Sequence, residues 1–411
     1  MSLGILIKFH REKNGLTQEE LGKGVCSVTH VSKIERGTTQ FSSEITNLLS
    51  EKLGINMEAE LQSLQKFEKL LHQWHDCMVL QQNNEIERLK NQIEKNSLFL
   101  IQSVKNTYFL LQARYFLLQG DITNAEALID KIYNVRKDLN TYETHLLHHL
   151  LGITELQKGN FKKALEYLLK INEKEYENLE FYYQIAIAYH NLQFKVKAYY
   201  YSELSLEYFQ KTNNFKKIID AETIKLINEG RNELWDFDNL VNRYNQLIAQ
   251  CEIINDTSKK ANLLSNLAYE YSYSGDNENA RIYYKKTLDL LKGNKKSSNY
   301  LNNLIGYIYC CLQIKENNVD SMLTQLIQTG MEISKEIKDH SSLAFFQMLR
   351  LLHDDEKELY YQFIEEKIIP MLNKNGKYHQ LHTYEKTMFQ YYLDQGKHES
   401  ANKYASRLLN N

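Results

Sequence analysis

A short pattern returns along this chain after residue 100, and it constrains the fold more than any other feature. Each copy has a small residue, an aromatic residue about three positions later, then a glycine turn and an alanine. The copy at 261–291 is the most complete, with Ala268, Tyr271, Gly275 and Ala280. Small residues let two helices cross closely, and glycine closes the turn between them. Each copy therefore predicts a pair of antiparallel helices.

The copies are spaced like the units of a helical solenoid. Equivalent positions 113, 152 and 186 are 39 and 34 residues apart, close to the 34-residue period of tetratricopeptide repeats. Weaker copies are expected at 215–250 and 340–370. One helix pair cannot bury its apolar stripe alone, so successive pairs must stack. We expect about eight pairs in a right-handed tetratricopeptide-repeat superhelix.

Composition agrees with an all-α chain that has more than one part. The 411 residues contain one proline, and proline ends or kinks helices, so long uninterrupted helices are favoured. The length exceeds that of a usual single domain, which favours several units or a repeat array. The predicted fold class is therefore all-α, with an N-terminal helix-turn-helix bundle followed by the superhelix.

Charge and cysteine content narrow the function classes. The net charge is −2, and residues 1–54 hold seven Lys or Arg against six Asp or Glu. Any contact with nucleic acid must therefore come from a local face. The five cysteines form no CxxC pair, and an odd number favours a reducing compartment. With no signal peptide and no apolar run that could span a bilayer, we expect a cytoplasmic protein without a membrane partner.

Residues 1–56 predict a compact bundle of short helices. A helix over 2–13 ends at Asn14-Gly15, and Thr17 with Glu20 forms a capping box for the next one. Ser27 caps a third helix that Gly37 closes. A fourth helix is expected with Ser42 or Ser43 as its cap and Ile45, Leu48, Leu49 and Leu53 as its apolar stripe.

The second and third of these helices form a helix-turn-helix arrangement, in which the second helix of the pair enters the DNA major groove. The alternative is a helical hairpin without a DNA partner. Five apolar residues suit a small shared core: Leu16, Leu21, Val25, Val31 and Ile34. The polar residues left outward can reach phosphates or base edges; they are Gln18, Ser27, Thr29, His30, Lys33 and Arg36.

The stretch LTQEELGKGVCSVTHVSKIERG, residues 16–37, resembles the helix-turn-helix of the phage-repressor-like (Xre-type) family. Gly22 replaces the alanine that is usual in the first helix. The resemblance implies that Gln18 contacts the phosphate backbone and that Glu35 serves the fold. It places Ser27, Thr29 and His30 at the groove-facing start of the second helix, and it implies phosphate contacts for Lys33 and Arg36.

Residues 57–98 predict a helical connector, because they contain no proline or glycine and their apolar residues recur at helical intervals. The sequence fits one long helix, or two that break near 81–84. His72 and His75 could share a metal ion, but no third ligand is evident. A structural position on either side of a buried Trp74 is favoured over metal binding for these two histidines.

Residues 99–411 predict a peptide-sensing repeat domain, since the first helices of the pairs build a face that can hold an extended peptide. Asparagine can pair with both the N–H and the C=O of a peptide backbone, and tyrosine offers a flat apolar wall. The alternative is that these tyrosines pack between helices. Projecting the register of the best copy gives Arg114, His149, Tyr183, His190, Asn191, Asn262, Ser265, Asn266, Tyr269, Tyr273, Asn303 and Tyr307.

Catalytic constellations are not evident in the sequence. There is no HExxH, no GxSxG and no glycine-rich phosphate loop. The histidines in THLLHHLLG, residues 144–152, have no nearby acid in a metal-ligand register, so a structural or groove role is favoured. We expect no enzyme activity, no cofactor and no metal.

The combination of a repressor-like unit, a helical connector and a long repeat array resembles the peptide-pheromone receptors of Gram-positive bacteria. This group includes the Rgg, Rap, NprR and PlcR proteins, and the array suggests the NprR-like or PlcR-like branch. The resemblance implies a homodimeric transcription regulator that binds palindromic operator DNA, changes oligomeric state or spacing, and is switched by a short signalling peptide.

Two other functions fit the same features. A Rap-like protein would regulate a response-regulator phosphotransfer protein, alone or beside a DNA-binding role. Its phosphatase version would need a catalytic residue such as Gln81, Gln82 or Glu85 in the connector. A phage receptor that governs lysis or lysogeny would present much the same sequence.

Overall fold

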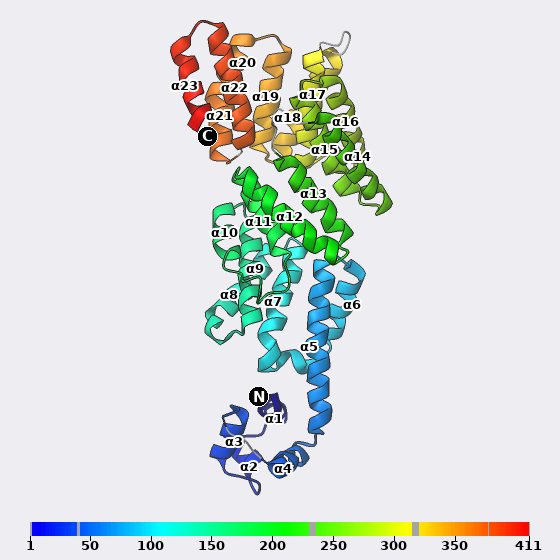
Figure 1. Ribbon diagram of the computed structural model, residues 1–411, viewed down its shortest axis with the longest axis vertical. Helices are drawn as coiled ribbons and strands as arrows, with labels where there is room; N and C mark the ends of the chain where they lie inside the picture. Colours follow the sequence, from blue (N-terminus) through cyan, green and yellow to red (C-terminus); the bar gives the residue numbers. More distant parts are fainter. Residues whose placement is uncertain (1, 39–41, 230–235, 315–319, 377, 411) are drawn as a thin grey trace. The chain divides into compact units, whose positions relative to one another are not determined.

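Every regular element that the structure describes is a helix, which confirms the predicted all-α class. The structure, shown in Figure 1, is a computed structural model that describes residues 2–410 except 39–41, 230–235, 315–319 and 377. By its internal contacts the chain divides into two compact units. Unit 1 comprises Met1–Ala188 and Tyr201–Ile218, and unit 2 comprises Tyr189–Tyr200 and Ile219–Asn411.

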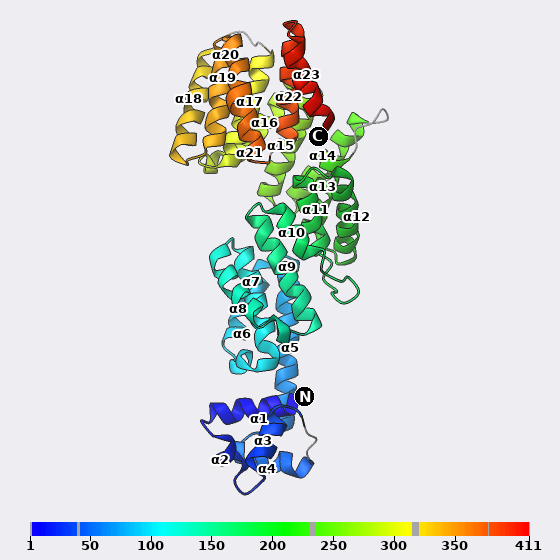
Figure 2. The ribbon, with the colours of Figure 1, turned by 90° about the vertical axis from the view of Figure 1, so that its left-hand side faces the viewer.

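The first four helices of unit 1 gather in a small bundle (Figure 2). They are α1 (Ser2–Lys13), α2 (Gln18–Gly22), α3 (Val28–Glu35) and α4 (Ser43–Leu53). The predicted caps are present: Thr17 and Glu20 form the capping box, and the Ser27 and Ser42 side chains accept bonds from His30 N and Ile45 N. Leu49 and Leu53 are buried in α4, whereas Leu48 is 41% exposed and does not belong to the apolar stripe.

Helices α1 and α3 approach each other more closely than most helix pairs. A Cβ atom added to Gly4 in α1 would lie 2.0 Å from the Ile34 carbonyl oxygen in α3. Only glycine fits this crossing, because the obstacle is backbone that cannot turn aside. The packing of α1 on α3 therefore requires glycine at position 4, which the helical periodicity of residues 2–13 does not predict.

The predicted connector consists of two helices, α5 (Met57–Val79) and α6 (Asn83–Glu94). Of the two predicted alternatives, the structure thus has the broken one. The chain turns at Gln81, whose φ is +55°. Fully buried Trp74 donates from its indole Nε1 to the Ile86 carbonyl at 3.1 Å, which joins the two helices. Residues 57–94 therefore form a helical hairpin of the same kind as the repeats that follow.

The remaining helices follow the predicted repeat order. Unit 1 continues with α7 (Gln102–Leu118), α8 (Ile122–Asn134), α9 (Thr141–Gln157) and α10 (Phe161–Leu168). The boundary between the units crosses α11 (Phe181–Asn191), α12 (Lys195–Lys211) and α13 (Phe215–Asn228). Unit 2 contains α14 (Phe237–Ile253), α15 (Thr257–Tyr273), α16 (Asn277–Leu290), α17 (Ser298–Ile314), α18 (Asp320–Glu336), α19 (His340–His353), α20 (Lys357–Phe363), α21 (Ile369–Lys374), α22 (Tyr378–Asp394) and α23 (His398–Asn410).

Small residues lie where neighbouring helices cross, as the repeat pattern predicts. A Cβ added to Gly152 would meet the Leu168 side chain at 2.5 Å, and one added to Gly306 would meet the Tyr284 ring at 2.4 Å. Gly275 has a φ of +89° in the turn between α15 and α16. The close crossings at Gly152 and Gly306 and the left-handed turn at Gly275 therefore lie at positions that the repeat pattern names.

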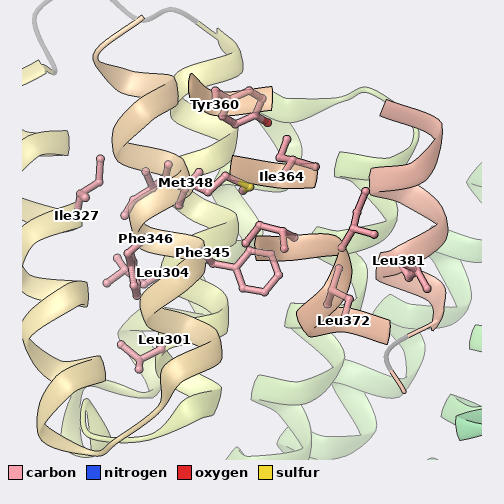
Figure 3. Close-up of a cluster of buried hydrophobic side chains, with 14 of the residues drawn as sticks. Leu301, Leu304, Ile327, Phe345, Phe346, Met348, Tyr360, Ile364, Leu372 and Leu381 are labelled. Atoms are coloured by element: carbon pink, nitrogen blue, oxygen red, sulfur yellow. The ribbon is translucent and has the colours of Figure 1, made fainter. Parts of the chain in front are cut away.

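A large apolar core of unit 2 extends from α17 to α23 (Figure 3). Phe346 is fully buried, and its ring occupies the space that a side chain at position 330 would need. The chain's one proline, Pro370, is the second residue of α21, which follows a π-helical turn over Ile364–Ile368. A π turn re-pairs carbonyls near a residue that has no N–H, so helix continues from Lys357 to Lys374.

None of the helices that the structure describes combines the length and the apolar content that crossing a bilayer requires.

Candidate functional site

The start of α3 offers a row of accessible polar groups. Ser27, Thr29, Lys33 and Arg36 are exposed. Because the N-terminal residues of a recognition helix are those that meet base edges, Thr29 is in the place where a base contact would form. The Arg36 Nε donates to the Ser32 carbonyl at 3.1 Å, which directs its guanidinium along the end of α3.

A buried ion pair fixes α3 against the rest of the bundle. Arg11 in α1 donates from Nε to Glu35 Oε1 at 2.6 Å and from Nη2 to Glu35 Oε2 at 3.1 Å. Its Nη1 also donates to the Leu16 carbonyl at 2.8 Å. The hydrogen bond with Glu35 raises the pKa of the Arg11 guanidinium. This network agrees with the expected structural role of Glu35 and orients α3 through α1.

Two of the six predicted DNA contacts are less exposed than expected. The Gln18 amide turns inward, and its Nε2 donates to Glu35 Oε2 at 2.9 Å. His30 is half-buried, and its Nε2 is enclosed without a hydrogen-bond partner among the described residues. Gln18 thus contacts the buried pair instead of the outer row, because Glu35 has acceptor capacity left for a third donor.

In unit 2, neighbouring first helices carry a polar and aromatic surface. Asn262 on α15 accepts at Oδ1 from Asn299 Nδ2 on α17 at 3.3 Å. Tyr273 is 53% exposed, and its ring centroid is 6.4 Å from that of Tyr269. We call the exposed or half-buried members the α15–α17 surface; they are Asn262, Ser265, Asn266, Tyr269, Tyr273, Asn299 and Tyr307.

Asparagines occupy equivalent positions in two successive repeats of this surface. Asn299 lies 37 residues after Asn262, and Asn303 lies 37 after Asn266. The projection missed Asn299, although its spacing from Asn262 was the signal that could have found it. Asn303 is 1% exposed, contrary to the expected outward position, because its Nδ2 donates to the Asn299 carbonyl at 2.9 Å within α17.

In unit 1, the predicted residues Arg114 and His149 are buried, which also differs from the outward position expected. Arg114 is 4% exposed, and its Nη2 donates to Glu180 Oε2 at 2.8 Å. Lys217 Nζ lies 3.8 Å from Glu180 Oε1 and 4.6 Å from the centroid of the Tyr183 ring. Burial alone would raise the pKa of Glu180, but Arg114 and Lys217 lower it below its usual value.

Two neutral histidines lie beside this pair. His75 Nδ1 is 2.8 Å from the Tyr142 hydroxyl, and His149 Nδ1 is 3.1 Å from the Tyr176 hydroxyl. Burial lowers the pKa of His75 to about 3 and that of His149 to about 4, and the Arg114 charge acts in the same direction. His75 is buried next to Trp74 on α5, as its structural role predicts. Among the described residues, no three or more His, Cys, Asp or Glu side chains are grouped so that they could hold a metal ion.

His190 and Asn191 belong to unit 2 with the α15–α17 surface. His190 Nδ1 lies 3.1 Å from Asn228 Oδ1, and burial lowers the pKa of its imidazole. Asn191 is half-buried. The twelve predicted peptide contacts therefore divide into three residues of unit 1, which are Arg114, His149 and Tyr183, and nine of unit 2.

The N-terminal bundle matches a family model described as helix-turn-helix over residues 7–59. Over 396 residues the chain is 24% identical to the transcriptional activator NprA of Geobacillus stearothermophilus, covering 93% of this chain and 97% of that protein. These two matches show that the predicted helix-turn-helix lies in a chain related to a transcription activator along nearly its whole length.

Solved structures share the repeat fold. The apo form of the quorum sensor NprR from B. thuringiensis matches with a TM-score of 0.68 at 22% identity, covering 84% of this chain and 98% of that one. NprR in complex with its cognate peptide NprX gives 0.66 at 23% identity, with the same coverage. A Rap protein complexed with competence and sporulation factor gives 0.67 at 14% identity, covering 84% of this chain and 97% of that one.

The expected resemblance is thereby confirmed: the chain is a relative of the transcriptional activator NprA that joins an N-terminal helix-turn-helix domain to the tetratricopeptide-like helical fold of NprR and Rap.

Proposed function

We propose that this chain is a peptide-responsive transcription regulator. It binds palindromic operator DNA as a homodimer through α2 and α3, and a short signalling peptide on the repeat array switches it. The observation that carries the proposal is the joining of a helix-turn-helix to a repeat array with an accessible row of asparagine and tyrosine. The relationship to NprA over 93% of the chain supports it.

The DNA contact is derived from the exposed face of α3. Thr29 lies at the groove-facing start of the helix and offers a hydroxyl that donates or accepts, while Lys33 and Arg36 supply positive charge at the phosphates. The Arg11–Glu35 pair holds α3 in a fixed orientation. Two such helices read half-sites about one helical turn apart, so a homodimer and a palindromic operator go together.

The DNA-binding half is tested by selecting binding sequences from a random DNA pool with the purified full chain. Thr29→Ala should weaken specific binding by roughly 1–3 kcal/mol, because its exposed hydroxyl is the group proposed to contact a base edge. Lys33→Ala should weaken all sequences alike and reduce the salt slope by about one. Lys66→Ala, an exposed lysine on α5, is the matched control. A pool that yields no enriched sequence would contradict the proposal.

The peptide contact is derived from the α15–α17 surface. An extended peptide has unpaired N–H and C=O groups that need partners, and the side-chain amides of Asn262 and Asn266 supply both kinds. Tyr269 and Tyr273 add apolar walls that cover the peptide side chains. The solved complex of NprR with NprX supports a peptide as the ligand class. In unit 1, the buried Arg114 and His149 would contribute only if the peptide reaches them.

The peptide half is tested with synthetic peptides from short reading frames beside the gene that carry a secretion signal. Titration of the full chain with each peptide should give one that binds, and Asn266→Ala should weaken it. Arg114→Ala is a less direct test, because it also breaks a buried ion pair. Lys292→Ala, which is exposed between α16 and α17, is the control. Normal binding by Asn266→Ala would contradict the assigned register.

The switch would act through the distance between the two recognition helices. A peptide shifts an equilibrium between two states only by its differential affinity for them. We expect the bound peptide to change the preferred spacing of half-sites, measured with operators of different spacer length. The same spacing preference and the same affinity with and without peptide would contradict the coupling.

The Rap-like alternative fits less well. The repeat fold is shared with a Rap protein at 14% identity, but the chain also carries the helix-turn-helix over 7–59 and follows NprA along nearly its whole length. The connector residues that a phosphatase would use lie in the turn after α5 and the start of α6, where Gln82 Oε1 accepts from Cys77 Sγ at 3.5 Å. Nothing at this turn favours catalysis.

A further inference from the structure

Helix α5 contacts the DNA-binding bundle at one end and the repeat helices at the other. Near its start, Glu60 Oε2 lies 3.1 Å from His10 Nε2 of α1, and Met57 is buried. Near its end, Leu71, Trp74 and His75 are buried. A contact that fixes the second half of α5 therefore also affects the position of the bundle, because both are joined by the same helix.

The first such contact is Asn178, from the segment between α10 and α11. Its Nδ2 lies 3.3 Å from His75 Nε2. Its Oδ1 accepts from Glu180 N at 3.1 Å and from the Tyr208 hydroxyl at 3.2 Å. Because the Oδ1 is occupied in this way, the amide nitrogen faces His75 and donates to it. Asn178 thus ties α5 to the start of α11 and to α12.

The second contact is Asn214, at the turn between α12 and α13. It is buried, and its Nδ2 donates to the Val79 carbonyl at 2.9 Å. This carbonyl is among the last four of α5, which have no partner within the helix. Asn214 Oδ1 accepts from Lys217 N at 3.3 Å. The residue that holds the C-terminal end of α5 therefore also binds the backbone of Lys217, whose Nζ lies 3.8 Å from Glu180 Oε1.

Both asparagines are connected to Glu180: Asn178 through the Glu180 backbone, and Asn214 through Lys217. Glu180 follows Asn178 by two residues and donates its backbone N–H to Asn178 Oδ1, and its side chain lies between Arg114 and Lys217. Arg114 Nε is buried and has no hydrogen-bond partner among the described residues. A new partner for this guanidinium would compete with Glu180, and a shift of Glu180 would change the contacts of both asparagines.

We propose that Asn178 and Asn214 form a clasp on α5, through which the state of the Arg114–Glu180 pair sets the position of the helix that leads to the DNA-binding bundle. Both are positioning residues, because they contact α5 and do not belong to the exposed polar residues of α3. The regulatory meaning of the clasp rests on the proposed function; its mechanical part does not.

Hydrogen–deuterium exchange of the full chain tests the mechanical part without a peptide or an operator. The double variant Asn178→Ala/Asn214→Ala should exchange about tenfold faster at the amides of residues 71–79, because local opening of α5 then breaks fewer contacts. Asn228→Ala is the matched control: Asn228 is also a buried asparagine bonded to a histidine, His190, but in unit 2. It should leave α5 unchanged.

A second pair of variants separates the clasp from general loss of stability. Glu180→Gln keeps the size of the side chain and removes its charge, so α5 should again exchange faster. Glu155→Gln is its control, because Glu155 is also buried and accepts from Lys163 Nζ at 2.7 Å and Asn160 Nδ2 at 2.8 Å, away from α5. If Glu155→Gln speeds exchange in α5 as much as Glu180→Gln does, the proposal is overturned.

The last measurement asks whether loosening of α5 also reaches the DNA-binding bundle. Loosening of α5 should raise exchange at residues 57–60 and 6–13 and change operator affinity at least threefold. Unchanged exchange of α5 in the double variant overturns the clasp, and loosening confined to 71–79 overturns the transmission. A wild-type chain that binds no DNA refutes the proposed function alone, since the exchange coupling would still be observed.

Discussion

In unit 1, Arg114 and Glu180 are 4% and 1% exposed and bind each other, whereas in unit 2 the row around Asn262 and Tyr273 is accessible. Arg114 belongs with Asn262 and Tyr273 to the peptide contacts predicted from one repeat register, whereas Glu180 does not. Their difference arises from the segment between α10 and α11, which supplies Tyr176 and Glu180 and covers the first set. Equivalent positions on repeated helices can thus be buried in an ion pair in one unit and accessible to solvent in the other.

The difference has an energetic side. Buried charges need each other, so removing one partner strands the other in an apolar setting. Exposed amides exchange a protein partner for water at little cost. The buried set should therefore dominate stability and its pH dependence, and the exposed set should dominate ligand affinity. The predictions below test this division.

The largest effect should come from breaking the buried pair. Arg114→Met should lower the free energy of unfolding by about 3–5 kcal/mol, because Glu180 would keep a buried charge with only Lys217 near it. The double variant Arg114→Met/Glu180→Leu should recover much of the loss. Urea unfolding followed by circular dichroism measures both. A single variant as stable as wild type would remove the basis of the comparison.

Acid should destabilise unit 1 through its two neutral histidines. Their folded pKa values of about 3 and about 4 lie below the unfolded value near 6.5, so the unfolded chain binds more protons as the pH falls. Stability is complete above about pH 6.5 and is lost as the pH falls toward the folded values. Between pH 7.5 and 5 each histidine should cost about 2 kcal/mol.

The check is urea unfolding at the two pH values for wild type and for His149→Gln, which does not titrate. The variant should show a smaller loss between pH 7.5 and 5 than wild type does. An equal loss in both would show that His149 does not contribute to the pH sensitivity.

In unit 2, a close helix crossing should matter more than the polar row. Gly306→Ala puts a Cβ 2.4 Å from the Tyr284 ring, which is itself buried. We expect a loss of about 1–3 kcal/mol, typical of overpacking. Thermal unfolding measures it, and Gly293→Ala, where a Cβ meets nothing within 4 Å, is the control.

The smallest stability effect should follow Asn262→Ala. Its contact with Asn299 is 3.3 Å long and exposed to water, so the change in unfolding free energy should stay within about 0.5 kcal/mol. A loss of several kcal/mol would show that the accessible row is structural, and would erase the contrast with the buried pair.

The sequence predicted features that depend on local chemistry. The capping role of Thr17 and the glycine turn at Gly275 were readable because caps and turns need particular residue types. The helix-turn-helix was identified from the resemblance of residues 16–37 to the Xre-type family, since caps and periodicity alone also fit a plain helical hairpin.

The burial of Arg114 and His149 was not readable. It depends on Tyr176 and Glu180, which lie in an irregular segment with no periodicity to register them against the helices. The same holds for Asn178 and Asn214, whose partners on α5 lie more than 100 positions earlier in the chain. Long-range polar contacts from connecting segments leave no periodic trace.

Helix α5 also has a geometric consequence. Its 23 residues make a rod about 34 Å long, at about 1.5 Å per residue. A tilt of about 5° around the end held by Asn214 would carry the other end about 3 Å, close to the 3.4 Å rise between successive base pairs. A tilt of only a few degrees at the end of α5 held by Asn214 would therefore displace the start of the helix by about the spacing of one base pair.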